Sequence, residues 1–568
     1  MKMVSRYIKI MLLIIFFNPG ISKSQTLPVG TPVLEDYYRR AQLLGKLDPN
    51  ISFTVRPLYS SKSLNANNIF DPDSALEKRR DGNFNGIYRF WGKFGKIQLL
   101  PFTWENQYTT YHPYSINDGV MIPARGYQTS IEAGIYAKLG PLSFQLRPEV
   151  VYAENRTFPD FFKDQPDYIR AAWYSHLNYI DFPERFGDNI YKKFFLGQSS
   201  ILLTVGPLSL GLSTENLWWG PGMRNSLMMS NTAPGFEHIT FNTVRPIKTF
   251  IGSFEGQLIG GRLENSGFAP FDTTFEYSGN KVYAPKRNDW RYINGFVLSY
   301  QPKYFKGFFA GLTRTFIVYH NDMGDRIKDY LPIITPIDKK ANYGEGESSV
   351  PGDQRASAFI RWVWGKEHAE LYCEFLREDH AYDSRDMFLE PDHTHAYLFG
   401  FQKLMPLKRE GQYLQVNLEL TQLAQTGTNP ERPTGSIYLH YAGISQGYTN
   451  RGQLLGAGIG PGSNMQSLQI SWLKAYNRLG IQVERYVHNY DFYTSVVKDI
   501  RANWVDFSIS ALGEWNYKNL VFSGSLNVIR CYNYDFLYRP DASNPPSFWD
   551  PGKDVYNCQG KVSVMYRF

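Results

Sequence analysis

Apolar and polar residues alternate with a period of two along most of this chain. The segments 414–421 and 505–511 carry an apolar residue at every second position, with acids, amides or hydroxyls between them. Successive side chains of a strand point to opposite faces, so the pattern predicts strands with one apolar and one polar face. In 369–376 the polar face carries Glu370, Tyr372 and Glu374. Such strands suit the wall of a barrel with an apolar outside and a polar lumen.

Residues 560–568 predict a strand that ends on an aromatic residue. Its apolar face ends with Tyr566 and Phe568, and its other face carries Lys561 and Arg567. The closing strand of a transmembrane barrel has this pattern. The ending also resembles the signal that the outer-membrane barrel assembly machinery reads. The alternative is a buried terminal strand of a secreted β-sandwich.

Residues 1–24 predict a secretory signal peptide. Three basic residues precede an apolar run at 10–17, and a Pro19-Gly20 break and the small residue Ser24 follow. The run is shorter than the roughly 20 residues that span a bilayer. We therefore expect an exported chain that begins at Gln25.

One helix is predicted within residues 25–50. Thr31 can cap it, Pro32 fits its first position, and Glu35 favours its positive end. Its apolar stripe runs from Leu34 to Leu44 and needs a surface to pack on. We assign residues 25–50 to an N-terminal periplasmic helical segment and residues 51–568 to the barrel.

Composition agrees with an all-β membrane protein. The 568 residues have a mean hydropathy of −0.38 and no long apolar run, which excludes a helical membrane protein. Aromatic residues make up 16%, as expected where rings mark both membrane interfaces. The net charge is +7, but four basic residues and no acid lie in 1–24, so nucleic acid is not an expected partner. We expect Cys373, Cys531 and Cys558 to be free thiols, with Cys531–Cys558 as the pair that could bridge.

Turns and loops divide between two ends. The repeated Gly-Pro segments 139–143 and 205–209 predict tight turns, which we assign to the periplasmic end. The polar stretches 321–354 and 532–554 are expected to be extracellular loops, because outer-membrane barrels place their long loops outside.

Residues 213–236 combine more constrained residue types than any other stretch, including the pair Trp218-Trp219 and a Gly-Pro-Gly bend at 220–222. A Glu-Asn-x-Trp-Trp-Gly-Pro-Gly run leads here to Ser-Asn-x-Ala-Pro-Gly, and this run resembles the Wzi family of outer-membrane capsule-assembly proteins. The similarity is strongest over 205–264, and the blocks 374–393 and 447–462 are similar to that family as well. The resemblance implies a lectin-like β-barrel of about 18 strands. It also implies an N-terminal helical bundle that closes the periplasmic mouth, of which this sequence offers one helix.

Carbohydrate recognition needs flat aromatic faces and fixed hydrogen-bonding groups, and a guanidinium can hold an acidic group bidentately. From the matching blocks we select these candidate polysaccharide-binding residues: Glu215, Asn216, Trp218, Trp219, Asn225, Arg262, Asp379, His380, Tyr448, Asn450, Arg451 and Gln453. The alternative is that they form an internal polar network that holds the barrel shut.

Catalysis, cofactors and metals are not expected. A glycosidase needs two carboxyls about 5–9.5 Å apart, and the sequence does not fix the separation of Glu374, Asp379 and Asp392. His393 and His395 come nearest to a metal cluster, but no Glu-x-x-His pair or cysteine joins them.

Together these features predict a non-enzymatic outer-membrane barrel of a Gram-negative bacterium that binds capsular or exopolysaccharide and aids its surface attachment or assembly. Expected partners are that polysaccharide, outer-membrane lipid and lipopolysaccharide, and the barrel assembly machinery during biogenesis, with envelope proteins as further candidates. Two alternatives remain open: a porin or substrate channel, and an accessory subunit of an envelope secretion or surface-assembly complex.

Overall fold

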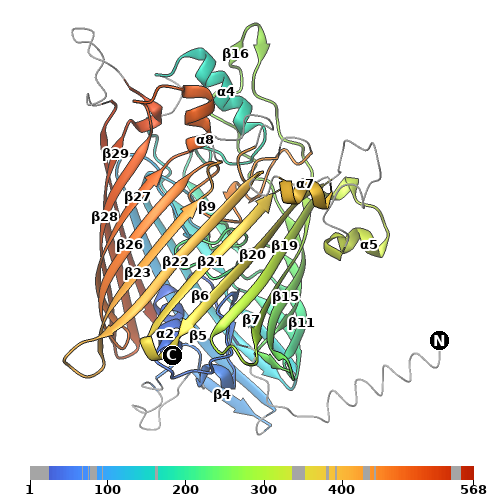
Figure 1. The fold of residues 1–568 in the computed structure, drawn as a ribbon, viewed down its shortest axis with the longest axis vertical. Coiled ribbons are helices and arrows are strands. Elements are labelled where there is room, and N and C mark those ends of the chain that lie inside the picture. The colour runs from blue at the N-terminus through green and yellow to red at the C-terminus, as the bar shows by residue number, and fades with distance from the viewer. Residues whose placement is uncertain are drawn as a thin grey trace.

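The structure, a computed structural model, describes residues 25–66, 68–73, 76, 86–91, 94–159, 164–334, 352–378, 383–389, 393–425, 435–440, 443–538 and 552–568. Its main feature is a closed antiparallel barrel of 18 wall strands (Figure 1). The barrel closes where β5 (Gly95–Thr109) pairs with β30 (Val555–Tyr566), at a register that sets Gln559 opposite Thr109. The predicted fold class is confirmed.

Three wall strands are each made of two pieces. β7 (Leu142–Leu146) and β8 (Glu149–Ala153) form one, because both pair with β6 (Gly126–Leu139). β9 (Tyr191–Phe195) and β10 (Ser200–Val205) form the next, since β9 pairs with β8 and β10 with β7. β13 (His238–Thr243) and β14 (Ile247–Lys248) form the third. β4 (Ile87–Phe90) pairs with the first residues of β5.

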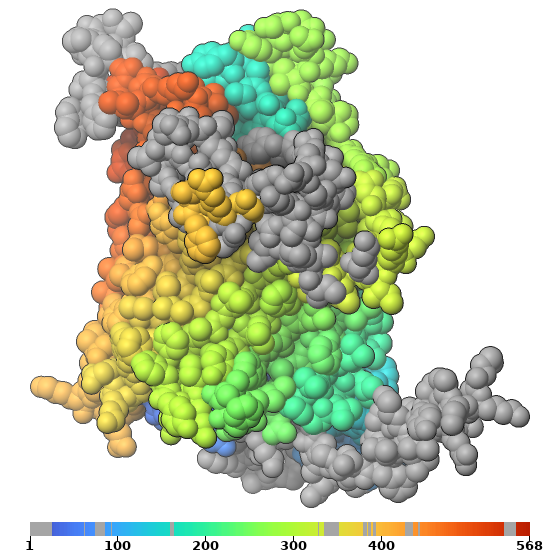
Figure 2. Space-filling model, turned by 45° about the vertical axis from the view of Figure 1, so that its right-hand side comes forward, coloured from blue at the N-terminus to red at the C-terminus, as the bar shows by residue number. Residues whose placement is uncertain are grey.

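The other wall strands follow one another around the barrel in chain order. They are β11 (Leu208–Ser213), β15 (Gly252–Leu263), β18 (Arg291–Pro302), β19 (Phe308–Tyr319), β20 (Gly352–Trp364), β21 (Ala369–Glu378), β22 (His395–Pro406), β23 (Gln412–Gln422), β26 (Asn464–Lys474), β27 (Asn477–Val487), β28 (Val505–Tyr517) and β29 (Leu520–Tyr532). Figure 2 shows this order on the outer surface as neighbouring bands of orange, yellow and green.

The wall strands alternate as the sequence pattern predicted. In β28, Phe507 and Ile509 are exposed on the outside, whereas Asp506 and Ser508 are buried on the lumen side. In β21 the buried lumen side carries Glu370, as expected. Free energy favours this arrangement because apolar side chains meet lipid, while polar ones find partners inside.

The two Gly-Pro turns lie at one end of the barrel. They join β6 to β7 and β10 to β11 as tight hairpins, in which Gly140 and Gly206 have φ of 59° and 62°. The described parts of the two long polar stretches lie at the opposite end, including α5 (Ile327–Tyr330) (Figure 1). We take the turn end as periplasmic and the loop end as extracellular.

A cap stands on the extracellular end. It contains α4 (Asp167–Leu177), α8 (Tyr490–Phe492), which continues as the π-helical turn η5 (Tyr493–Val497), and the hairpin of β16 (Glu276–Tyr277) and β17 (Asn280–Lys281) (Figures 1 and 2). A short helix, α7 (Ser384–Leu389), lies at the same end of the wall. The apolar side chains of α4 pack on α8 and η5, which holds the cap together.

The N-terminal segment lies inside the periplasmic half of the barrel. Its helix, α2 (Pro32–Leu43), starts at the predicted residues, and its stripe residues Leu34 and Tyr38 are fully buried (Figure 1). The opposite, polar face is buried too, because Arg39 pairs with Glu370 of the inner wall and Arg40 donates to the carbonyl of Ala475 in the turn after β26. From the apolar stripe alone, we would expect the polar face of the helix to contact water.

This N-terminal segment extends beyond residue 50, where the sequence placed the start of the barrel. β1 (Thr26–Leu27) pairs with β3 (Leu58–Tyr59) inside the lumen, and a 3-10 turn, η1 (Lys62–Leu64), follows. Of the described wall strands the first is β5, which begins at Gly95, and β4 pairs with it from Ile87. The predicted signal peptide, residues 1–24, lies outside the described residues. None of the helices in the described ranges is both long and apolar enough to cross a membrane.

Segments from both ends fill the lumen. Beside the described residues of 25–73, the stretches 110–125, 214–237 and 443–462 fold inward, the last with the small hairpin of β24 (Thr449–Asn450) and β25 (Gln453–Leu454). The largest apolar cluster of the described chain lies here and includes Trp219, Met228 and Tyr448. Polar side chains of the inner wall are therefore buried against protein.

Candidate functional site

The Trp-Trp motif forms an inward loop of the wall. The chain leaves the wall after Ser213 and returns at His238, and between them β12 (Trp218–Trp219) pairs with β2 (Val55–Arg56) of the N-terminal segment. Gly220 has φ of 110°, and a Cβ at this position would lie 2.6 Å from Oε2 of Glu374. Both the backbone conformation and the close approach to the wall therefore require glycine here.

The two indoles have different surroundings. Trp219 is fully buried against the inner wall, where its Nε1 donates to Oε1 of Gln257 at 2.9 Å. The guanidinium of Arg56 lies 4.4 Å from the ring centroid of Trp218, whose Nε1 has no hydrogen-bond partner in the described chain. Trp219 therefore belongs to the core, and Trp218 faces an internal cavity.

The short polar residues of the motif hold it in the lumen. Glu215 accepts hydrogen bonds from Thr26, Ser213 and Gln145. The side chain of Asn216 donates to Asn231 and to the carbonyl of Ala233, both at 2.8 Å. These two candidates are therefore engaged inside the protein, as the alternative of an internal polar network predicted.

Glu419 on the inner face of β23 is the main wall anchor of the motif. Its carboxylate accepts the backbone N–H groups of Met223, Arg224 and Asn225 at 2.8, 3.0 and 2.7 Å, and the hydroxyl of Tyr372 at 2.9 Å. Asn225 also donates from its side chain to Thr421 at 3.1 Å. The sequence placed Glu419 on a polar strand face, and that was the only signal that could have found it.

Two candidates in the block at 447–453 are also held inside the protein. Tyr448 is fully buried, stacks on Tyr438, and has the Arg355 guanidinium 4.3 Å from its ring centroid. Gln453 is buried, and its Nε2 donates to the carbonyl of Gly119 at 3.1 Å. Neither side chain is exposed to bind a polymer in this structure.

Three candidates meet at a notch of about 200 Å³, next to the place where the chain leaves the wall between β11 and β13. Arg262 comes from the outward face at the end of β15, and Asn450 and Arg451 come from the inner hairpin. The exposed side chains of Phe194 and Leu196 border the notch on the wall side. The notch therefore opens on the outside of the barrel near its extracellular end.

Charges in the notch are not all neutralised. Arg262 Nε lies 2.6 Å from Glu264, and its guanidinium lies 5.0 Å from the ring centroid of Trp290. Asn450 is held rigidly, because it donates to the carbonyl of Pro234 and accepts the N–H of Glu264. The Arg451 guanidinium has no ion pair to any described residue, and its nearest ring is Phe195 at 5.8 Å. The notch thus presents a half-buried cation beside fixed polar groups.

A second space of about 450 Å³ lies inside the barrel between the inner segments and the wall. Trp218 and Arg56 line one side of it, and small polar wall residues such as Ser523 and Ser563 line the other. Its charged groups are largely paired, for example Lys561 with Asp118 and Arg224 with Glu484. Polar and apolar side chains both line this cavity, and of the selected residues that the structure describes only Trp218 is among them.

Asp379 and His380 lie outside the described residues, as does Asp392. Of the proposed carboxyl pairs only Glu374 can be placed. It is buried and accepts a hydrogen bond from Ser357 at 2.7 Å. His393 and His395 are buried as well. All three cysteines are free thiols, as expected.

The extracellular cap contains a partly buried acid. Asp491 of α8 accepts the hydroxyl of Ser436 at 2.7 Å and the backbone N–H of Gln425 at 2.8 Å. Burial raises the pKa of this carboxyl to about 6, and the two hydrogen bonds offset only part of that effect.

An apolar outer surface, a closed wall and a lumen filled by its own segments define this chain as an outer-membrane-type β-barrel with an internal plug. The sequence profile described as capsule assembly protein Wzi matches residues 111–521, which is more than half of the chain. The chain belongs to the Wzi capsule-assembly family.

One solved structure shows the same fold. Wzi from Escherichia coli, described as an outer-membrane protein involved in group 1 capsule assembly and as a carbohydrate-binding β-barrel, is 13% identical. The match covers 96% of this chain and 100% of that one, with a TM-score of 0.59. OccAB4 of Acinetobacter baumannii is 8% identical, with 85% and 99% of the two chains covered and a TM-score of 0.37. A comparison with curated proteins gave no match.

Proposed function

We propose that this protein is a non-enzymatic barrel that binds an acidic capsular or exopolysaccharide at the cell surface and aids its attachment. The observation that carries the proposal is the notch in which Arg262, Asn450 and Arg451 meet. These residues come from two separate sequence blocks, and Arg262 and Arg451 are the described candidates that combine cationic charge with an opening to the outside. Membership of a capsule-assembly family supports the same function.

The chemistry of the notch suits one acidic group. Arg451 offers a guanidinium that no described acid neutralises, and Arg262 is half exposed next to it. A guanidinium binds a carboxylate or phosphate bidentately. Glu149, Glu237 and Glu264 also line the notch, so they would accept hydrogen bonds from sugar hydroxyls and disfavour a second anion.

Size limits what the notch can hold. Its volume of about 200 Å³ is below the roughly 300–1,000 Å³ of most small-molecule pockets. It would therefore hold a single acidic residue or substituent of a polymer, with weak affinity for each repeat. Many copies of the barrel on one cell would convert weak contacts into firm retention by avidity.

The filled lumen argues against a diffusion porin. The inner segments and the wall share the large apolar cluster around Trp219, and the internal space beside Trp218 measures about 450 Å³. Glycosidase chemistry has little support either, because Glu374 is buried beneath Gly220 and hydrogen-bonded to Ser357. The exposed apolar outer wall would contact outer-membrane lipid and lipopolysaccharide.

The test compares Arg451→Gln with Arg326→Gln, a matched change of an exposed arginine on another extracellular loop. A hydrogen bond to a charged group contributes about 1.5–3 kcal/mol, so we expect Arg451→Gln to weaken binding of the purified barrel to an acidic polysaccharide roughly 10- to 100-fold. A neutral polysaccharide serves as a second control.

Cells provide the second readout. A strain that carries Arg451→Gln should release surface polysaccharide into the medium, and a strain with Arg326→Gln should retain it. Equal retention by the two strains would contradict the role of the notch. Unchanged retention after deletion of the whole gene would contradict the proposed function itself.

A further inference from the structure

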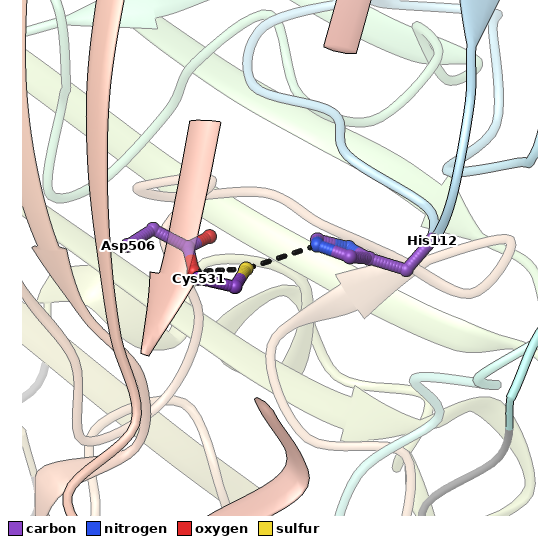
Figure 3. Close-up of side chains that lie close together, drawn as sticks. All are labelled: His112, Asp506 and Cys531. Carbon is purple, nitrogen blue, oxygen red and sulfur yellow. Dashed lines mark hydrogen bonds between the residues drawn. The ribbon is translucent and has the colours of Figure 1, made fainter. Parts of the chain in front are cut away.

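Three groups with lone pairs meet inside the extracellular half of the barrel. Asp506 of β28 and Cys531 of β29 are paired across the two strands, and His112 reaches them from the loop after β5 (Figure 3). His112 Nε2 lies 3.1 Å from the sulfur of Cys531, and that sulfur lies 2.5 Å from Oδ1 of Asp506. All three side chains are buried, and their facing atoms lie within 4.8 Å of one another.

This cluster has one hydrogen too few to place a hydrogen bond in each of its close contacts. Nδ1 of His112 lies 3.0 Å from the carbonyl of Pro113, which can only accept, so Nδ1 carries the hydrogen. In the neutral ring Nε2 then presents a lone pair to Cys531. The thiol has one hydrogen and two acceptors, the imidazole nitrogen and the carboxylate of Asp506. One of these contacts therefore brings two lone pairs together unless a further cation lies between them.

Surrounding groups hold the three side chains in place. Oδ2 of Asp506 faces Nε2 of His488 at 2.9 Å, and Trp504 Nε1 donates to Oδ1 at 3.3 Å. Tyr534 stacks on His112, with ring centroids 4.9 Å apart. Metal-binding histidines and carboxylates usually have such outer partners, which fix the tautomer and the orientation of each ligand.

We propose that Nε2 of His112, Sγ of Cys531 and a carboxylate oxygen of Asp506 bind one zinc ion. Thiolate, imidazole and carboxylate together suit zinc, whereas calcium and magnesium prefer oxygen ligands alone. With Zn–S near 2.3 Å and Zn–N or Zn–O near 2.0 Å, tetrahedral geometry separates ligand atoms by about 3.5 Å. Modest side-chain rotations reach that spacing from the observed contacts.

Binding has a defined proton balance. The Cys531 thiol loses its hydrogen to solvent as the sulfur–zinc bond forms, while His112 and Asp506 bind as the neutral ring and the carboxylate. A second proton on His112 would also complete the hydrogen-bond chain, but it would place a charged imidazolium in a site closed by Tyr534. A water molecule would take the fourth position of the metal. Zinc would tie the inward loop at 110–125 to the wall.

The experiment removes the two other thiols first. Cys373 and Cys558 lie partly exposed on strands β21 and β30, outside the cluster, so Cys373→Ser with Cys558→Ser leaves Cys531 as the single sulfur ligand. The purified, folded barrel is incubated with one equivalent of zinc, desalted, and analysed for metal. Cobalt is added in a parallel sample, because a thiolate ligand to cobalt gives a charge-transfer absorption in the near ultraviolet.

We expect about one zinc per chain and the cobalt–thiolate band in this two-serine protein. Adding Cys531→Ser should lower zinc retention at least tenfold and abolish the band. The three cluster residues are intact in the two-serine protein. If this protein fails to retain zinc or to give the band, the proposal is wrong. Equal zinc retention after Cys531→Ser would overturn it as well.

Discussion

The buried ion-pair cluster around Glu370 should decide whether α2 stays in the lumen. Glu370 lies on the inner face of β21 and accepts Nε of Arg39 from α2 at 2.6 Å and Nε of Arg361 from β20 at 2.7 Å. The side chains of all three residues are at most 4% exposed. In Glu370→Gln the shape is kept, but two buried guanidinium groups lose their counter-charge.

The expected cost follows from burial. Breaking a buried ion pair by removing one partner costs about 3–5 kcal/mol, whereas an exposed pair contributes about 0–1 kcal/mol. Glu367→Gln is the matched control, because the Glu367–Lys403 contact of 3.5 Å is exposed at the same end of the wall. At 1.4 kcal/mol per factor of ten, the lower end of this cost means that Glu370→Gln should raise the undocked fraction of α2 by at least roughly two orders of magnitude.

Native-state proteolysis measures this fraction directly. Trypsin can cut α2 at Arg39 or Arg40 only when the helix leaves the lumen, so the cleavage rate follows the undocked population. We expect an at least roughly 100-fold faster cut in Glu370→Gln, and at most about fivefold in Glu367→Gln. Gel mobility without heating confirms that the wall stays folded. Cleavage rates of the two variants within fivefold of each other would refute the reasoning.

Two further outcomes are expected. Trp219→Phe should lower the free energy of unfolding in urea by about 2 kcal/mol more than Trp218→Phe, because only Trp219 donates a hydrogen bond, to Gln257; equal losses would contradict the assigned surroundings. The raised pKa of Asp491 means that the folded cap binds a proton which the unfolded chain releases near pH 4, so stability falls as pH rises from about 4 to about 6. Asp491→Asn should flatten that slope and stabilise the cap by about 1–3 kcal/mol at pH 7.5, measured by hydrogen exchange, and an unchanged slope would contradict it.

The strands could be predicted because their signal is local. Alternation over six or more residues fixes which side chains face lipid, and β28 shows it clearly in Phe507 and Ile509. The sequence pattern did not predict that β7 and β8, or β9 and β10, together form one wall strand. Each break is a local bend inside a single strand of the barrel. The pattern also could not predict that residues 51–66 lie in the lumen, because short pairings such as β1 with β3 depend on the walls around them.

The site was predictable only in part. Family resemblance selected Arg262, Asn450 and Arg451, which meet in one notch. The same resemblance selected Trp219, which is buried in the core instead. Its position depends on contacts with the wall, such as the hydrogen bond to Gln257, and the strand pattern, which ends at Ser213, does not predict them. The cluster of His112, Asp506 and Cys531 has no spacing signature at all. It exists because the register of β28 with β29 sets Asp506 opposite Cys531 and a separate loop delivers His112.

The pairing of β12 with β2 has a mechanical consequence. β2 belongs to the N-terminal segment, which occupies the periplasmic half, whereas β12 belongs to the loop between the upper ends of β11 and β13. The Gly220 N–H continues this ladder to the carbonyl of Thr54 at 2.9 Å. A pull on the inward loop at 214–237 would therefore be shared with the N-terminal segment through this ladder, so neither of the two lumen segments would move without the other.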